Sequence, residues 1–237
     1  MLNPSYIKKQ KCNKFSVFHC NVRSLRRNLN NLVTYIARLD FGFDIIALSE
    51  TWLKADETLS MQGFRLLSQP RNSRARGGGV ALFIQDNNAC NVLLDASVTN
   101  ATIETLFIKM EKEPVIGVVY RPPGCSIKAF LKEFESVLMG VSYMHYNNIV
   151  VVGDFNIDLS PDTSNEYTLL LKSFNLCNVI NEPTRITNTS CTLIDHALCN
   201  VGNDVHAGVL PVLIADHLPI FVTLINEPLN TKPSRRK

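Results

Sequence analysis

Four acidic residues each stand at the end of a short run of apolar residues. These acids are Glu50, Asp154, Asp195 and Asp216. Apolar runs of this length are typical of buried strands, and a residue at the end of such a strand reaches the edge of the sheet. Carboxylates that converge at one edge repel each other unless a cation or a phosphate-binding group offsets their charge. One such acid alone is usually a turn or cap residue, but four together indicate a shared polar cleft.

Two amides and one imidazole have related positions. Asn21 ends the first apolar run, and Asn156 stands two residues after Asp154, on the same side of an extended chain. An amide can donate a hydrogen bond to a phosphate oxygen while a carboxylate accepts a proton from water. A hydrogen bond between His217 and Asp195 would give a partner to a carboxylate that has apolar neighbours. These residue types are suited to chemistry on a phosphate ester.

The other four histidines carry less information. We interpret His19, His145 and His206 as ordinary core or surface residues, because that is the usual role of a lone histidine. His196 follows Asp195 directly, so a regular strand would turn it to the opposite face of the sheet. The sequence therefore singles out His217 alone as a functional imidazole.

Short apolar runs alternate with amphipathic stretches, which predicts a mixed α/β domain. Helices are expected at 24–39, with Ser24 as the N-cap, at 127–138 and at 166–174. Strands are expected at 15–20, 43–48, 64–67, 79–84, 90–94, 103–110, 114–120 and 149–152, and near 185–199, 205–213 and 219–225. The strands between 64 and 120 are too close together for helical crossovers, so we expect them to pair antiparallel. Two sheets packed face to face, with helices outside, would satisfy this pattern.

The 237 residues and 46% apolar content favour one domain at 15–225, between an N-terminal linker at 1–14 and a basic tail at 226–237. The net charge of +3 is too small to demonstrate a polyanionic partner. Seven cysteines without a C-x-x-C pair suggest neither a disulfide framework nor zinc, and they favour a reducing compartment. No apolar stretch is long enough for a membrane span, and no signal peptide is recognised, so we expect a protein that is not secreted.

Several segments, in their order along the chain, resemble the motifs of the endonuclease/exonuclease/phosphatase superfamily. The segments are Asn21, 49–51, 120–123, 153–156, 193–196 and 215–217. The resemblance extends from about residue 15 to residue 224. The amino-acid sequences of the segments 48–53, 76–80 and 120–123 are most similar to those of the apurinic-like endonuclease domain of non-LTR (LINE-type) retrotransposons.

This resemblance implies a DNase I-like fold, a four-layered α/β sandwich of two mostly antiparallel sheets with the active site at one rim. It also implies a role for each matching residue. Glu50 would hold a divalent metal, with Asn21 and Asp216 close to it, and Asp154 would orient or deprotonate the attacking water. Tyr120, Asn156 and His217 would hold the phosphate, and Asp195 would orient His217. Oxygen ligands alone favour Mg²⁺, with Mn²⁺ as a substitute.

One position departs from the family's pattern, and a few others are candidates for binding phosphate. Ala215 stands where the family usually has serine, so we expect reduced but not absent activity. Contacts to a nucleic-acid backbone are expected from arginines and, with less support, from threonine hydroxyls. These candidates are Arg23, Arg121, Arg71 to Arg76, Thr184 and Thr192. The glycines at 77–79 lack the ending of a nucleotide-binding loop, and we interpret them as a turn or a close backbone approach.

The expected function is that of a metal-dependent endonuclease acting on double-stranded DNA and leaving a 3′ hydroxyl, as the target-nicking domain of a non-LTR retrotransposon. We expect a monomeric domain in the nucleus, without a membrane partner, that can belong to a longer polyprotein with a reverse transcriptase. Two alternatives stay open. The same catalytic set could act on lipid or inositol phosphates, or the chain could be a decayed module that binds nucleic acid without turnover.

Overall fold

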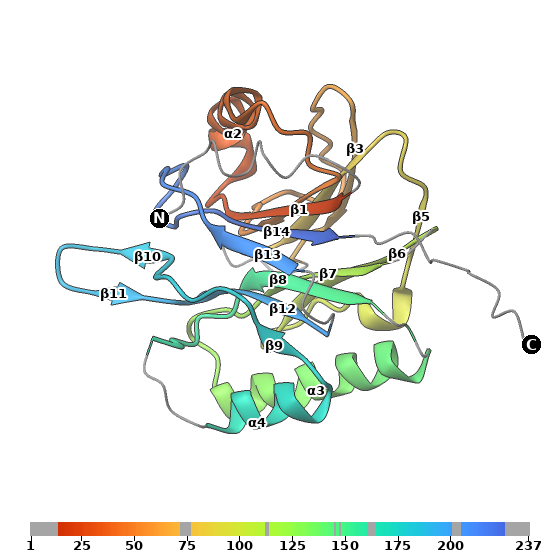
Figure 1. Ribbon diagram of the computed structural model, residues 1–237, viewed down its shortest axis with the longest axis vertical. Helices are drawn as coiled ribbons and strands as arrows, with labels where there is room; N and C mark the ends of the chain where they lie inside the picture. The colour runs from red at the N-terminus through yellow and green to blue at the C-terminus, as the bar shows by residue number, and fades with distance from the viewer. Residues whose placement is uncertain are drawn as a thin grey trace, which may run out of the picture.

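Two six-stranded β-sheets pack face to face in the computed structural model (Figure 1). The structure describes residues 14–71, 77–111, 114–144, 146, 148–160, 165–200 and 205–225. The first sheet has the order β13 (Val205–Val209), β14 (Ile220–Ile225), β1 (Lys14–Asn21), β2 (Ile45–Ser49), β4 (Val80–Gln85), β3 (Phe64–Gln69). The second has the order β5 (Cys90–Val92), β6 (Glu104–Met110), β7 (Val115–Tyr120), β8 (Ile149–Asp154), β12 (Asp195–Cys199), β9 (Cys177–Asn178).

Each sheet is antiparallel except for one central parallel pair. In the first sheet β1 and β2 run parallel and are connected through α2 (Leu25–Leu39). In the second sheet β7 and β8 run parallel and are connected through α3 (Ile127–Tyr143). A parallel pair requires such a crossover connection, and a helix is the usual one. The two mostly antiparallel sheets expected from the sequence are therefore confirmed.

The helices form the two outer layers of the fold. Figure 1 shows α2 on the outside of the first sheet, and α3 with α4 (Glu166–Ser173) on the outside of the second. Buried apolar side chains fill all three interfaces: one cluster lies between the sheets, one under α2, and one under α3 and α4. The result is the four-layered α/β sandwich that the resemblance implied.

Some element boundaries differ from the predicted ones. The helix predicted at 127–138 continues to Tyr143. The segment near 185–199 is divided into β10 (Arg185–Ile186), β11 (Cys191–Thr192) and β12, because Thr187 accepts hydrogen bonds from the backbone of residues 189 and 190 and forms a tight turn between β10 and β11. The strands predicted to reach 94 and 213 end at Val92 and Val209. No helix in the described part of the chain is long and apolar enough to cross a membrane.

Ser24 stands at the N-cap position of α2, as predicted, but its side chain makes no cap hydrogen bond. Its φ of 86° is incompatible with the extended backbone that an N-cap requires. Its amide instead donates to the carbonyl of Glu50, which ties the start of α2 to the end of β2. The predicted linker and tail, 1–14 and 226–237, lie outside the described residues apart from Lys14.

His196 lies on the face of β12 opposite the cleft, as expected. Its ring stacks on Phe155 with 4.9 Å between the ring centroids. Nδ1 accepts a hydrogen bond from the hydroxyl of Tyr167, and Nε2 donates to the carbonyl of Leu193. Both hydrogen bonds suit a neutral imidazole with its proton on Nε2. Burial, the largest effect, lowers the pKa of His196 to about 4.

A depressed pKa of this kind makes the fold sensitive to acid. The unfolded state binds a proton near pH 6.5 and the folded state near pH 4, so stability is full above pH 6.5 and falls between these values. We expect a loss on the order of 3 kcal/mol from this group. Urea unfolding across this pH range should show a shallower acid dependence, by about one proton, in His196→Gln. His206→Gln on β13 is the matched control, and equal slopes in the two variants would refute the assignment.

Candidate active site

The carboxyl ends of β1, β2, β7 and β8 meet at one rim of the two sheets. Asn21 pairs in register with Ser49, the residue before Glu50, and Tyr120 pairs with Asp154. Because β12 is antiparallel to β8, its first residue, Asp195, also pairs with Asp154. The parallel pairs and this register bring polar side chains from distant parts of the sequence to one edge.

A cleft of about 470 Å³ opens at this rim. Most of the predicted site residues line it: Arg23, Glu50, Tyr120, Asp154, Asn156, Asp216 and His217. Trp52, Arg71, Pro122, Pro123 and Arg185 complete most of the remaining wall. Four carboxyl-bearing or amide side chains and one imidazole therefore share the space that the sequence predicted.

The amide of Asn21 joins two of the acids. Its nitrogen donates to Oε1 of Glu50 at 3.0 Å and to Oδ2 of Asp154 at 2.9 Å. Glu50 also accepts from the hydroxyl of Tyr120 at 3.2 Å. The carbonyl oxygen of Asn21 accepts from the backbone amide of Arg23, so it is turned away from the acids. Asn21 thus acts here as a donor between two carboxylates, which reduces their repulsion.

Asp154 is 1% exposed, and burial raises the pKa of its carboxyl to about 7. The negative charge of Asp195 acts in the same direction, while His217 and the hydrogen bonds from Asn21 and from the backbone of Asn156 oppose it. A carboxylate with a pKa near the working pH is well suited to accept a proton from water. Its position at the cleft therefore fits the role of general base.

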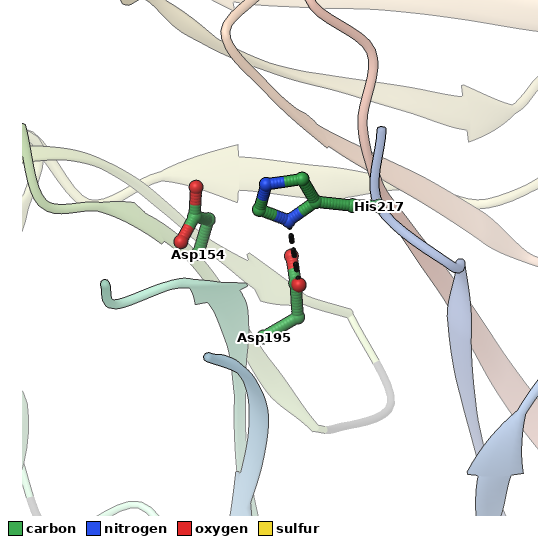
Figure 2. Close-up of side chains that lie close together, drawn as sticks. All are labelled: Asp154, Asp195 and His217. Carbon is green, nitrogen blue, oxygen red and sulfur yellow. Dashed lines mark hydrogen bonds and ion pairs between the residues drawn. The ribbon is translucent and has the colours of Figure 1, made fainter. Parts of the chain in front are cut away.

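Asp195 and His217 form a buried pair (Figure 2). Nδ1 of His217 lies 2.7 Å from Oδ2 of Asp195, and Figure 2 shows the other ring nitrogen turned toward Asp154. Burial would lower the pKa of His217, but the charge and hydrogen bond of Asp195 raise it to about 9. The same partner holds the pKa of Asp195 below its usual range despite burial. At neutral pH the imidazole is thus protonated and can donate from Nε2 into the cleft.

Two buried residues, Thr184 and His19, lie next to Asp195. Oγ1 of Thr184, which is fully buried, accepts hydrogen bonds from the backbone amides of Ile194 and Asp195. The imidazole of His19 lies 3.9 Å from Oδ1 of Asp195, and burial lowers its pKa to about 4. From the sequence, Thr184 is expected to contact phosphate and His19 to be an ordinary residue. In the structure both lie beneath Asp195, a placement that no local sequence pattern reveals.

The side chains of Asp154, Asp195 and His217 offer ligand atoms within 4.8 Å of one another, the geometry of a potential metal site. A protonated imidazole has no lone pair for a metal, however, and the raised pKa of His217 makes that form dominant. Glu50 is the better candidate, because its carboxylate faces the cleft next to Asp154 and both offer oxygen atoms. Such ligands fit Mg²⁺ or Mn²⁺.

Asp216, predicted near the metal, has two arginine partners in the structure. Its Oδ2 accepts from Nη1 of Arg23 at 3.0 Å and from Nη2 of Arg185 at 3.2 Å. These ion pairs join the start of α2 and strand β10 to the loop before β14. Asp216 shares the cleft with Glu50, and its role as a metal ligand stays a prediction.

The other residues predicted to contact phosphate differ in how exposed they are and in whether they line the cleft. Arg23 lines the cleft with its side chain 57% exposed, as a phosphate contact requires. Arg121 does not fit that role: it is 5% exposed, and its guanidinium donates to the carbonyls of Asn156 and Cys125. It braces the loop that carries Asn156, whose own amide donates to the carbonyl of Arg121. Thr192 is half-buried on β11, and Arg76 lies outside the described residues.

The glycines at 77–79 allow other segments of the chain to approach their backbone closely, as expected. All three have a positive φ, and a Cβ on Gly79 would lie 2.7 Å from Oγ1 of Thr51. A Cβ on Gly78 would lie 2.3 Å from Cζ of Arg71. Glycine is therefore required for the guanidinium of Arg71 to pass this loop into the cleft wall.

Arg71 has a buried partner, Glu104, which the sequence alone did not single out. Glu104 begins β6, is 0% exposed, and accepts hydrogen bonds from Nε of Arg71 and from the amide of Gly79. Burial raises the pKa of Glu104, while Arg71 opposes that effect. The guanidinium also lies 5.8 Å above the ring of Tyr120. An acid at the start of a buried strand was a signal for Glu104, but nothing in the sequence connected it with Arg71.

Backbone strain is concentrated at the same cleft. Seven non-glycine residues in the described segments have a positive φ, and four of them line it: Arg23, Glu50, Trp52 and Asn156. Such conformations cost free energy and persist where the surrounding structure holds them, most often at functional sites. This observation supports the cleft as the functional site without reference to residue type.

A model of the endonuclease/exonuclease/phosphatase family matches residues 18–217. The chain belongs to this family. Among curated proteins no match was found. Solved structures of the same fold include the endonuclease domain of TRAS1, a telomere-specific non-LTR retrotransposon, with 15% identity, a TM-score of 0.68 and coverage of 89% of this chain and 98% of that one.

Two further solved structures are similar in fold. The AP endonuclease LMAP from Leishmania major has 13% identity and a TM-score of 0.70, with coverage of 95% of this chain and 90% of that one. The 3′-5′ exonuclease NExo from Neisseria meningitidis has 16% identity and a TM-score of 0.67, with coverage of 89% and 99%. At these identities the likeness shows the fold alone.

Proposed function

We propose that this protein is a metal-dependent endonuclease that hydrolyses phosphodiester bonds of double-stranded DNA and leaves a 3′ hydroxyl. The observation that carries the proposal is the convergence of Glu50, Asp154 and the Asp195–His217 pair in one cleft. Hydrolysis of a phosphodiester needs an activated water, neutralisation of charge on the phosphate and help for the departing oxygen. The cleft contains side chains for each of these needs.

Each side chain has a separate task in this proposal. Asp154 orients the attacking water and accepts its proton, and the backbone amide of Asn156 holds Oδ1 of Asp154 at 3.0 Å. The protonated His217 donates from Nε2 to a non-bridging oxygen of the phosphate, and Asp195 keeps it charged and oriented. Tyr120 and Asn156 supply further donors at the cleft wall, next to Glu50 and Asp154.

Glu50 is the proposed metal-binding residue, with Asp216 and Asn21 nearby. A divalent cation bound there would supply Lewis-acid stabilisation of the charge on the phosphate and on the departing oxygen. The carboxylate of Glu50 is already oriented by Asn21, Tyr120 and Trp52. Oriented oxygen ligands of this kind favour Mg²⁺, with Mn²⁺ as a substitute.

A role as the target-nicking domain of a non-LTR retrotransposon fits the motifs at 48–53 and 120–123 and the similarity of fold to the TRAS1 endonuclease domain. Double-stranded DNA is the substrate in this proposal. The cleft offers it three guanidinium groups, from Arg23, Arg71 and Arg185. A nuclear location follows from that substrate.

Relaxation of supercoiled plasmid tests the proposal directly. We expect the purified protein to convert supercoiled DNA to the nicked circle with Mg²⁺ or Mn²⁺, and a chelator should abolish the conversion. A polymerase that extends only from a 3′ hydroxyl should incorporate nucleotides at the nick. Folded protein that leaves plasmid intact in both metals, but releases phosphate from inositol or lipid phosphates, would instead favour the alternative substrate class. Binding of DNA without turnover would favour a decayed binding module.

Ala215 gives a gain-of-function prediction. The residue is half-buried next to Asp216 and His217, where a serine hydroxyl could donate to the bound phosphate or to a neighbouring carboxylate. A hydrogen bond to a charged group is worth about 1.5–3 kcal/mol, so Ala215→Ser should raise the nicking rate by roughly tenfold. Ala215→Val adds bulk without a hydroxyl and serves as the control. A rate for the serine variant at or below that of the wild type would contradict the prediction.

A further inference from the structure

Trp52 is the only tryptophan of the chain, and it is left 40% exposed at the cleft. An exposed indole forgoes much of the free energy that its burial would contribute. Its neighbours in sequence, Thr51 and Leu53, are buried at 1% and 5% exposure, so the segment is anchored on both sides of the exposed ring. A large aromatic surface held at the wall of a polar cleft is typical of a binding surface.

The ring is fixed in position. Trp52 has a φ of 56°, a strained value for a tryptophan, and its amide donates to the carbonyl of Gly78 at 2.9 Å. Its Nε1 donates to Oε2 of Glu50 at 3.2 Å. A Cβ on Gly77 would lie 3.5 Å from Nε1, so the glycine loop packs closely along the indole. The exposed surface is therefore presented in one orientation at low entropic cost to a ligand.

The surroundings indicate which part of a ligand the indole would meet. Arg23, Arg71 and Arg185 place three guanidinium groups at the cleft, and these suit phosphate groups. Trp52 provides a flat apolar surface in the same cleft, next to Glu50. A nucleotide combines an anionic phosphate with a flat apolar base and a sugar, and aromatic side chains are common partners for such units.

We propose that Trp52 is a contact platform for the sugar and base of the nucleotide adjacent to the phosphate that is hydrolysed, an assignment that rests on the proposed function. The indole also contacts Glu50, the proposed metal-binding residue. A nucleotide packed on the ring would therefore be held in a fixed position relative to the reacting phosphate. A competing role is simpler: the indole N–H only orients Glu50. Phenylalanine separates the two roles, since it keeps a ring face but has no N–H.

Fluorescence of the single tryptophan tests the contact without any need for turnover. A defined oligonucleotide duplex is titrated into the full chain in chelator, so that the duplex stays intact, and binding is followed in parallel by anisotropy of a dye on the duplex. We expect the indole emission to change with the same midpoint as the anisotropy. Unchanged emission at saturating duplex would overturn the proposal.

Variants supply the second arm of the test. Trp52→Ala should weaken duplex binding about tenfold, whereas Trp52→Phe should stay within about twofold of the wild type. Leu169→Ala, at an exposed position on α4, is the control and should bind as the wild type does. Equal losses in the alanine and phenylalanine variants, both with the wild-type melting temperature, would overturn the platform and leave only the role of the N–H.

Failure of the proposed function has a different signature. A wild-type protein that neither binds the duplex nor nicks plasmid would refute the DNA substrate itself. A wild-type protein that nicks plasmid while its tryptophan emission stays unchanged on binding would refute the platform alone.

Discussion

Asp154→Asn is expected to lower the nicking rate about a thousandfold, because an amide cannot accept the proton of the attacking water. The replacement has nearly the same shape and keeps one oxygen, which can accept from the backbone amide of Asn156 in place of Oδ1, while the hydrogen bond from Asn21 to Oδ2 is lost. The fold should therefore be retained. Initial rates of plasmid relaxation at saturating Mg²⁺ measure the effect.

The same variant should be more stable than the wild type when no metal is bound. The folded-state pKa of Asp154, about 7, is above its reference value of 3.8, so the charged form destabilises the native state above pH 3.8. At pH 8 in chelator we expect the free energy of unfolding of Asp154→Asn to rise by on the order of 2–4 kcal/mol. The gain should vanish as the pH falls toward 3.8.

The control for Asp154→Asn is Asp95→Asn, which changes an exposed acid that does not line the cleft. That variant should match the wild type in nicking rate and in stability. A nicking rate for Asp154→Asn above about one hundredth of the wild-type rate would contradict the general-base role.

Arg71→Met is expected to destabilise the protein by about 3 kcal/mol, or roughly 10 °C in melting temperature. The reason is Glu104, which is fully buried and would lose the cation that compensates its charge. The loss should shrink as the pH falls toward 4.5, because burial raises the folded-state pKa of Glu104 and the protonated acid has no charge to bury. Urea unfolding at pH 8 and at pH 4.5 measures the difference.

Two further variants make the Arg71 prediction specific. Arg71→Met combined with Glu104→Gln should recover most of the lost stability, since a neutral amide replaces the unpaired charge. Arg26→Met removes a surface ion pair with Glu57 from an arginine that is 68% exposed, and should cost less than about 1 kcal/mol. If Arg71→Met costs no more than Arg26→Met, the buried pair does not have the structural role assigned to it.

Most of the fold could be predicted because burial leaves a recognisable pattern of apolar residues in the sequence. The runs at 45–49 and 149–154 are buried on both faces, and they appear as continuous apolar stretches. Short polar segments between the strands at 64–69 and 80–85 implied a local antiparallel pair, which the structure confirms. The segment at 185–192 was harder to predict, because its two short strands depend on a turn formed by threonine and serine side chains.

The sequence by itself determined which acids reach the rim and that His217 pairs with Asp195, because the end of a buried strand and the need of a buried charge for a partner are local properties. Only the tertiary structure decided which side chains meet across the two sheets. Arg71 meets Glu104 through the gap at Gly78, and Asp216 meets Arg23 across 193 positions of sequence. The tertiary structure also decided that Arg121 is buried rather than exposed. Such contacts depend on strand register and on how the two sheets pack against each other. Register and packing bring residues that are far apart in the sequence within hydrogen-bonding distance, and no local sequence pattern reports this.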